Sequence, residues 1–423
     1  MSSFSLADTA AFPATVVRLD SGLTLIHQEI AATPVAVVDV WVDAGAGREP
    51  DDWMGMAHFL EHMVFKGTDR LLPGMFDQAI ESQGGLTNAA TSHDYAHFYM
   101  TLAADTLPEA LPYLADLLLH PALPADEFWR ERQVVLEEIL QAHDDPDWQG
   151  YQGFSELLYG THPYGRPVLG TPDILNARSP EEMRQFHQAH YQPENITVVV
   201  AGGIALTRVL ELVQHAFRPF AQPVKCPEIA PQPTAPLTEV RRATMALPQL
   251  QHGRLMMAWL APGIEDLETA CGLDLLATVL AGGRTARLVQ ELQEQRQWVL
   301  ESDGSFSLQR DSSLMSLTFW LDPAQAGAVE QVVCDRIAEL AQHPITEPEL
   351  RRSQRLLCND YAFSTETPGQ IAGLYGYYGT IAQPELSVAY PDLIRAHNCE
   401  TLQQLARQYL SPDRYAAMVL EPA

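Results

Sequence analysis

Three stretches of the chain have a hydrophobic pattern regular enough to predict an element and to place polar residues on it. Residues 56–64 are apolar except at three positions, which predicts a short buried helix. Residues 126–140 have apolar side chains at helical spacing and follow a proline, so we predict a second helix there. Residues 95–100 alternate between Tyr or His and Ala, Phe or Met, which is the two-residue period of a β-strand.

The three polar residues of the first helix have the spacing of a metallopeptidase site. His58 and His62 are four residues apart, so their side chains share one helix face and can converge on one metal ion. Glu61 lies three residues after His58, where its carboxylate can reach a water on that metal without being a ligand. The order His-x-x-Glu-His is the inverzincin signature. We therefore predict a zinc site with Glu61 as the general base.

A third metal ligand should come from a second helix, because catalytic zinc usually has three protein ligands and one water. The helix predicted over 126–140 offers Glu131 and Glu138, which are seven residues apart and so lie on one face. From these residues alone, two interpretations are open. The pair is an exposed acidic stripe, or it supplies one metal ligand and one carboxylate that orients a ligand.

Proline-rich composition at residues 219–236, which contain six prolines, predicts an extended linker. The two sides of this linker look alike. A helix at 179–186, a proline turn and a strand at 196–200 recur as a helix at 401–407, a proline turn and a strand at 415–420. We therefore predict an α+β protein with two domains of one fold, 1–218 and 239–423, joined by a linker over 219–238. Each domain should be a mainly antiparallel sheet packed against helices.

Charge and composition narrow the class of protein. A net charge of -28 over 423 residues opposes nucleic-acid binding. The acidity either keeps the surface solvated or lines a chamber that attracts basic peptides. No apolar run of about 18 residues predicts a membrane span, and the first residues lack a signal-peptide pattern. Five scattered cysteines favour free thiols in a reducing compartment, so we expect a cytoplasmic location, with a periplasmic one after processing left open.

Two blocks of residues give the chain a specific resemblance to a known family. Residues 55–68 contain Gly-x-Ala-His-Phe-Leu-Glu-His-Met-x-Phe-Lys-Gly-Thr, and residues 84–95 contain Asn-Ala-x-Thr. In both, the chain resembles the pitrilysin family of zinc peptidases, and the match extends over essentially the whole chain. Glu138 lies 76 residues after His62, where that family has its third ligand. Glu131 matches the additional acidic residue of the family.

The resemblance implies roles for these residues. One Zn²⁺ per chain would be held by His58, His62 and Glu138, with Glu61 as the general base and Glu131 orienting a ligand or the water. A second set would bind the backbone of a peptide substrate as an edge strand: Asn88, Ala89, Ala90 and Thr91. Binding by strand addition depends little on side chains, so broad sequence tolerance would follow. A purely structural strand is the alternative.

The second half of the chain departs from the family pattern. It has no His-x-x-Glu-His, so we do not expect it to bind zinc. Complete members of the family supply an arginine there and, seven residues on, a tyrosine, which contact substrate near the metal. The corresponding residues here are Gln293 and Leu300. Gln293 can donate a hydrogen bond without charge, and Leu300 can donate none.

Two explanations of this departure compete. The chain is either the metal-bearing subunit of a two-subunit peptidase, similar to that of the mitochondrial processing peptidase and of bacterial two-subunit members, or a non-catalytic structural subunit of the same fold. The intact metal constellation favours the first. We therefore expect a heterodimer with a homologous chain that carries the Arg-x6-Tyr pair. The two chains would enclose a chamber in which peptides or unfolded segments are hydrolysed, without nucleic acid or membrane as partners.

Overall fold

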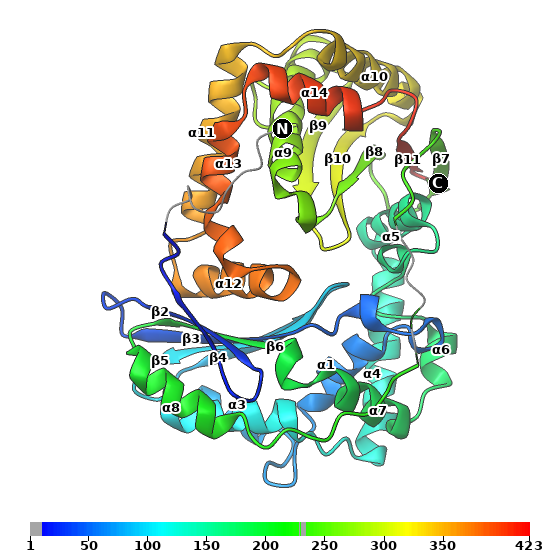
Figure 1. The fold of residues 1–423 in the computed structure, drawn as a ribbon. Helices are drawn as coiled ribbons and strands as arrows, with labels where there is room; N and C mark the ends of the chain where they lie inside the picture. Colours follow the sequence, from blue (N-terminus) through cyan, green and yellow to red (C-terminus); the bar gives the residue numbers. More distant parts are fainter. Residues whose placement is uncertain (1–10, 228, 230–233) are drawn as a thin grey trace.

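Two β-sheets, each covered by helices, make up the computed structural model, which describes residues 11–227, 229 and 234–423 (Figure 1). The strands of the first sheet lie in the order β1 (Thr15–Arg18), β2 (Thr24–Glu29), β6 (Ile196–Gly202), β3 (Val35–Val42), β5 (Ala96–Ala103) and β4 (Leu86–Thr91). Those of the second lie in the order β7 (Arg241–Ala246), β11 (Ala416–Glu421), β8 (Gly253–Pro262), β10 (Ser312–Leu321) and β9 (Val299–Ser307).

The five strands of the second sheet repeat the topology of five strands of the first, and β1 has no counterpart among the described strands of the second sheet. Neighbouring strands are antiparallel except at one place in each sheet, where β2 pairs with β6 and β7 pairs with β11 in parallel. Helix α7 (Pro180–His190) leads into β6, and helix α14 (Cys399–Tyr409) leads into β11, which occupies the equivalent position. The predicted α+β class and the repeat of one mainly antiparallel fold are confirmed.

Helices cover the outer face of each sheet (Figure 1). The core of the first unit lies between its sheet and the helices α1 (Met56–Val64), α2 (Met75–Ser82), α3 (Leu107–Leu119), α4 (Ala125–Asp144), α6 (Pro172–Asn176), α7 and α8 (Leu206–Ala216). The core of the second lies between its sheet and α9 (Leu267–Ala281), α10 (Ala326–Gln342), α11 (Glu347–Phe363), α13 (Tyr390–Ala396) and α14.

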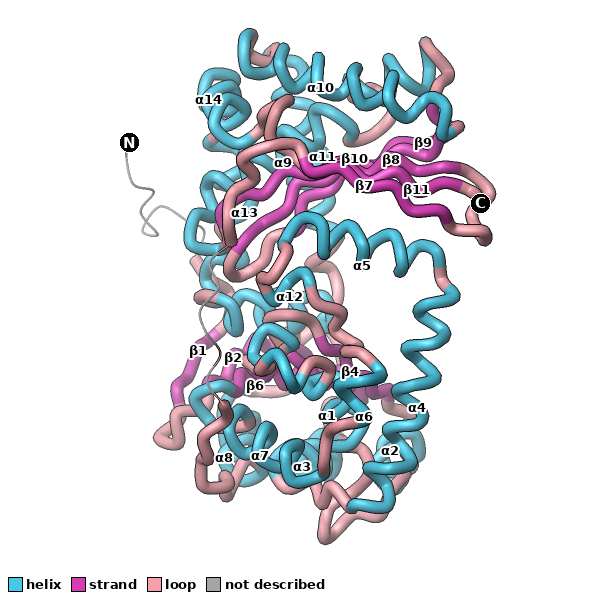
Figure 2. Tube along the Cα trace, turned by 90° about the vertical axis from the view of Figure 1, so that its right-hand side faces the viewer, coloured by secondary structure: helices cyan, strands magenta, loops and turns pink. Residues whose placement is uncertain are grey.

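Each half of the chain also contributes one helix to the sheet of the other half. Helix α5 (Pro146–Tyr159) lies against β7 and β11 of the second sheet (Figure 2), and α12 (Pro368–Ile381) lies on β3 and β6 of the first (Figure 1). Glycines permit both approaches, since a Cβ at Gly150 would lie 2.4 Å from a Leu420 methyl group and one at Gly376 would lie 2.0 Å from the Trp41 indole. The two halves therefore form one packed body.

The linker is described in part. Its residues 228 and 230–233 lie outside the described residues, and the rest of 219–238 forms neither helix nor strand. The domain limits at 218 and 239 stay a prediction. All five cysteines lie in described segments and are free thiols. Among the described helices, none has both the length and the apolar character that crossing a bilayer requires.

Candidate metal centre and peptide cleft

Helix α1 forms where the apolar pattern predicted it and is buried along most of its surface. Its apolar residues pack between the first sheet and helices α4 and α7: Met56, Ala57, Phe59, Leu60, Met63 and Val64. This packing fixes the rotation of the helix about its axis. His58 and His62 consequently face α4, which carries Glu138.

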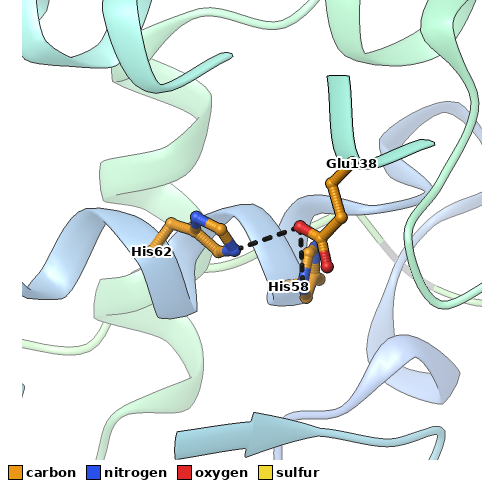
Figure 3. Close-up of side chains that lie close together, drawn as sticks. All are labelled: His58, His62 and Glu138. Carbon is orange, nitrogen blue, oxygen red and sulfur yellow. Dashed lines mark ion pairs between the residues drawn. The ribbon is translucent and has the colours of Figure 1, made fainter. Parts of the chain in front are cut away.

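The three predicted ligands lie together (Figure 3). The Nε2 atoms of His58 and His62 lie 3.7 and 3.4 Å from Oε2 of Glu138, and the ligand atoms of all three residues are within 4.8 Å of one another. Two ligands of a tetrahedral zinc, each about 2.1 Å from the ion, are about 3.4 Å apart. Nδ1 of His58 is buried and has no hydrogen-bond partner among the described residues. The donor set therefore fits a zinc ion.

Glu131 reaches this cluster through His62. Its Oε1 lies 3.0 Å from Nδ1 of His62, and its Oε2 lies 2.6 Å from Nζ of Lys66. Because a carboxylate can only accept, Nδ1 of His62 must carry a proton, and Nε2 is the ring nitrogen directed at the cluster, where it can bind a metal ion once it has lost its own proton. Glu131 is thus placed to hold the tautomer and the ring orientation of His62.

The electrostatics of the cluster favour a cation. Burial lowers the pKa of His62, but its hydrogen bonds with Glu131 and Glu138 outweigh burial and raise that pKa to about 9. The hydrogen bond from His62 in turn lowers the pKa of Glu138. Burial lowers the pKa of His58, so this imidazole stays neutral, as a metal ligand must be. Negative potential therefore surrounds the Nε2 atom of His62.

Glu61 lies beside the cluster and is linked to the edge of the sheet. Oγ1 of Thr91, at the end of β4, donates a hydrogen bond of 2.6 Å to Oε2 of Glu61. Burial raises the pKa of Glu61, and the Thr91 hydrogen bond opposes that shift. A carboxylate with a raised pKa is better suited to take a proton from water at neutral pH.

A cleft of about 620 Å³ joins these groups to β4. Its lining includes His58, Glu61, Glu138 and three of the four predicted substrate-strand residues, Ala89, Ala90 and Thr91. The fourth, Asn88, lies on β4 outside the lining, and its side chain accepts a hydrogen bond from the Ala89 N–H. Among the described strands β4 pairs with β5 alone, so it is an edge of its sheet.

Gln293 and Leu300, which stand where the family has its arginine and tyrosine, do not line the cleft at the metal centre. Gln293 is in a π-helical segment, Val289–Gln295, and Leu300 is on β9 with 59% of its surface exposed. The described residues that line the cleft include neither of them. The described lining of the cleft contains no arginine, lysine or tyrosine, so no described residue there replaces the positive charge and the phenol.

Glu49, which no pattern in the sequence singled out, anchors the start of α1. Its fully buried carboxylate accepts hydrogen bonds from the N–H groups of Gly55 at 2.9 Å and Ala57 at 2.6 Å. These are unpaired donors at a helix N-terminus, which a carboxylate satisfies well. An acidic residue shortly before an apolar helix is a sequence signal for such a cap, but Asp51 and Asp52 are nearer to the start of α1 than Glu49 is. Only the folded path of the chain shows that Glu49 accepts these hydrogen bonds.

Comparisons with known proteins show the family to which the chain belongs. Residues 25–172 match the family model described as insulinase (peptidase family M16), and residues 178–357 match that of the peptidase M16 inactive domain. The chain is 30% identical to an uncharacterized zinc protease of Mycobacterium leprae, over 98% of this chain and 93% of that protein. It is 25% identical to the zinc protease PqqE of Helicobacter pylori, over 96% and 92%. The chain belongs to the M16 family of peptidases.

Solved structures confirm the fold. A protease from Helicobacter pylori superposes with a TM-score of 0.89 at 24% identity, covering 97% of this chain and 99% of that one. Pitrilysin superposes with a TM-score of 0.81 at 18% identity, covering 98% of this chain but 45% of its own. The resemblance to the pitrilysin family is thus confirmed, while the likeness to metal-bearing subunits of two-subunit members stays a prediction.

Proposed function

We propose that this chain is the metal-bearing subunit of a zinc-dependent endopeptidase. The observation that carries the proposal is the convergence of His58, His62 and Glu138, whose ligand atoms lie within 4.8 Å of one another in a cleft that also contains Glu61. A structural acidic stripe on α4 would not require Glu138 to face two imidazoles. Zinc-protease relatives that match along nearly the whole chain support the same class.

Each residue of the centre has a separate role in peptide hydrolysis. A zinc ion bound by His58, His62 and Glu138 supplies a Lewis acid for water and for the scissile carbonyl. Glu61 takes a proton from the attacking water and delivers it to the leaving amine. Glu131 holds His62 in the ligating tautomer, and Lys66 holds Glu131.

The peptide binds as an added strand beside β4. Ala89, Ala90 and Thr91 line the cleft next to the metal centre, and the free edge of β4 offers backbone groups to an extended chain. Asn88 continues the same edge. Since a folded protein cannot present an isolated extended segment, the substrates are peptides and unfolded segments.

A second, homologous chain completes the active site. Where complete members of the family have the arginine and the tyrosine, this chain has Gln293 and Leu300, and neither residue lines the cleft. In pitrilysin the matched region is 45% of the chain, which leaves room for another unit of this size in the same polypeptide. We place the Arg-x6-Tyr pair on a partner chain, whose positive charge and phenol stabilise the oxyanion of the tetrahedral intermediate.

A non-catalytic subunit of the same fold is the alternative. The match of residues 178–357 to a domain described as inactive favours it for the second half of the chain. Metal content separates the two possibilities, because a scaffold has no need of zinc. The proposal expects one zinc ion per purified chain.

Exchange of Glu61 tests the mechanism. The Glu61→Gln variant should keep one zinc per chain, because Glu61 is not among the ligands, and should lose peptide cleavage in the presence of the partner by a factor on the order of a thousand or more. Glu137→Gln, a charge-matched change at an exposed position of α4, is the control and should cleave normally. Cleavage retained by Glu61→Gln would remove Glu61 as the general base.

A further inference from the structure

The tip of the hairpin formed by β9 and β10 joins the two halves of the chain through Arg310. Its guanidinium reaches from the second unit to the first, where Nη1 and Nη2 lie 3.1 and 2.8 Å from the two carboxylate oxygens of Asp43. Nη2 also donates a hydrogen bond of 3.1 Å to the Thr380 carbonyl oxygen of α12. Asp43 directly follows β3, so a side chain of the second half holds the end of a strand of the first sheet.

This ion pair is bidentate and partly buried. The side chains of Arg310 and Asp43 are 23% and 21% exposed. Burial raises the pKa of Asp43, but its hydrogen bonds with Arg310 and Arg48 outweigh burial and lower that pKa. A bidentate pair between arginine and a carboxylate fixes geometry as well as charge. Arg310 therefore sets the position of Asp43.

The loop after β3 is bonded to the turn between β4 and β5, residues 92–95. The N–H of Ala46 donates a hydrogen bond of 2.9 Å to the Ser92 carbonyl oxygen, and that of Gly47 donates one of 2.7 Å to the His93 carbonyl oxygen. A Cβ on Gly45 would lie 2.4 Å from the Ser92 oxygen, so loop and turn are in direct backbone contact. The ion pair thus holds the turn by way of this loop.

The tip of the hairpin also holds the turn directly, through the buried carboxylate of Asp94. One of its oxygens accepts a hydrogen bond of 3.1 Å from the Arg310 N–H, and the other accepts one of 2.7 Å from the Tyr164 hydroxyl. The Tyr164 oxygen in turn accepts a hydrogen bond of 3.1 Å from the Asp311 N–H. Neighbouring residues of the hairpin therefore act on the same turn by two connections.

The turn begins next to the residue that holds the proposed general base. Thr91 immediately precedes Ser92, and its hydroxyl donates the hydrogen bond of 2.6 Å to Glu61. The Ser92 N–H donates a hydrogen bond of 2.8 Å to the Tyr95 carbonyl oxygen, which closes the turn. Hydrogen bonds weaken steeply when their geometry is disturbed. A displaced turn would therefore loosen the bond between Thr91 and Glu61.

We propose that Arg310 is a positioning residue for peptide hydrolysis, acting on Glu61 through the turn between β4 and β5 and Thr91. The catalytic part of this inference rests on the proposed peptidase function. The three candidate metal ligands lie in the first half of the chain, whereas Arg310 lies in the second. The second half thereby contributes to the chemistry without contacting the substrate or the metal.

Hydrogen exchange tests the placement without turnover. In Arg310→Met, which keeps the stem of the side chain but none of its donors, the amides of residues 86–99 should exchange at least about fivefold faster, with α9 unchanged. Arg310→Lys keeps the charge and should restore most of the protection. Arg287→Met is the matched control, because Arg287 forms a bidentate pair of 2.7 and 3.1 Å with Glu349 inside the second unit.

A double-mutant cycle tests the connection to Glu61. In the reconstituted pair, Arg310→Met should lower kcat about fivefold and change KM less than about twofold. In a Thr91→Val background the same exchange should lower kcat less than about twofold, because the hydroxyl that Arg310 positions is already missing. A mere loss of folded protein would lower kcat by the same factor in both backgrounds. Asp43→Asn removes the other partner of the ion pair and should repeat the pattern.

The outcomes separate the two claims. Equal exchange of residues 86–99 in Arg310→Met and Arg287→Met overturns the placement, and equal losses of kcat in the two backgrounds overturn the action through Thr91. If Arg310→Met does not fold, Asp43→Asn and Arg310→Lys are measured in the same way. Faster exchange at 86–99, together with no cleavage by the unmodified pair, leaves Arg310 as the residue that positions Thr91 and refutes the peptidase function.

Discussion

Thr91 donates a hydrogen bond of 2.6 Å to Glu61, and this bond joins the edge strand to the helix that carries the metal ligands. Thr91 ends β4, along which the peptide is proposed to bind, and Glu61 is the proposed general base. One hydroxyl therefore sets the position of the base relative to the substrate strand. The orientation of a general base matters because proton transfer requires contact geometry.

Loss of this hydroxyl should impair the chemical step. Thr91→Val keeps the shape of the side chain and the backbone of β4, so KM should change little while kcat falls about tenfold. Thr91→Ser keeps the hydroxyl and should restore most of kcat. Steady-state kinetics with the reconstituted pair, alongside zinc analysis, would measure this. Equal kcat values for the Thr91→Val and Thr91→Ser variants would show that this hydrogen bond has no part in catalysis.

Glu131 should control zinc affinity without being a ligand. In Glu131→Gln the partner of His62 loses its charge, and zinc should bind roughly 10- to 100-fold more weakly. Competition with a chromophoric chelator measures the affinity. Glu137→Gln on the same helix removes one exposed carboxylate and should leave affinity unchanged. Identical affinities of the two variants would contradict the role assigned to Glu131.

The backbones of Gly55 and Gly170 lie in contact, and this contact should be sensitive to a single methyl group. In Gly170→Ala, the added Cβ would lie 2.6 Å from the Met54 carbonyl oxygen in a backbone conformation with φ of +75°. We expect a loss of stability on the order of 2 kcal/mol, seen as a lower thermal midpoint. Gly369→Ala is the matched control, because it lies in helix α12 with open space around it. A Gly170→Ala midpoint equal to that of the control would refute the close contact.

His187 should make stability depend on pH. Its Nε2 donates a hydrogen bond of 2.7 Å to the Leu118 carbonyl oxygen, and complete burial lowers its pKa from 6.5 to about 4. Between these values the unfolded chain binds the extra proton, so stability is present above pH 6.5 and is lost as pH falls toward 4.

Urea denaturation at pH 7.5 and pH 5 measures this effect. Between the two pH values, the free energy of unfolding should fall by about 2 kcal/mol more in the unmodified chain than in His187→Gln. His343→Gln, at an exposed histidine, should behave as the unmodified chain. A His187→Gln variant with the full pH dependence would show that this imidazole is not the source.

Local patterns in the sequence predicted the elements that carry the chemistry. His58, Glu61 and His62 share one helix, so their spacing alone fixes their relative positions within α1. The repeat of helix, proline turn and strand predicted two units of one fold, because each unit must bury its own sheet face. Glu138 required the family resemblance, since helical periodicity on α4 does not say what that face meets.

Contacts between segments far apart in sequence were beyond prediction. The apolar face of α5 shows that the helix is buried, but nothing local says that the second sheet covers it. Trp148, in the first turn of α5, lines the cleft that contains His58 and Glu138, and its position there depends on that docking. In the same way, three acidic residues precede α1, and only the path of the chain brings Glu49 rather than Asp51 to the helix terminus.

Hydrolysis of a quenched fluorescent peptide tests the central claim most directly. The purified chain is assayed alone and mixed with a homologous chain that has the Arg-x6-Tyr pair but no His-x-x-Glu-His, each with and without a metal chelator. The account predicts cleavage in the mixture only, abolished by the chelator and restored by zinc. Cleavage by the chain alone at the rate of the mixture would contradict the shared active site, and chelator-resistant cleavage would contradict the zinc centre.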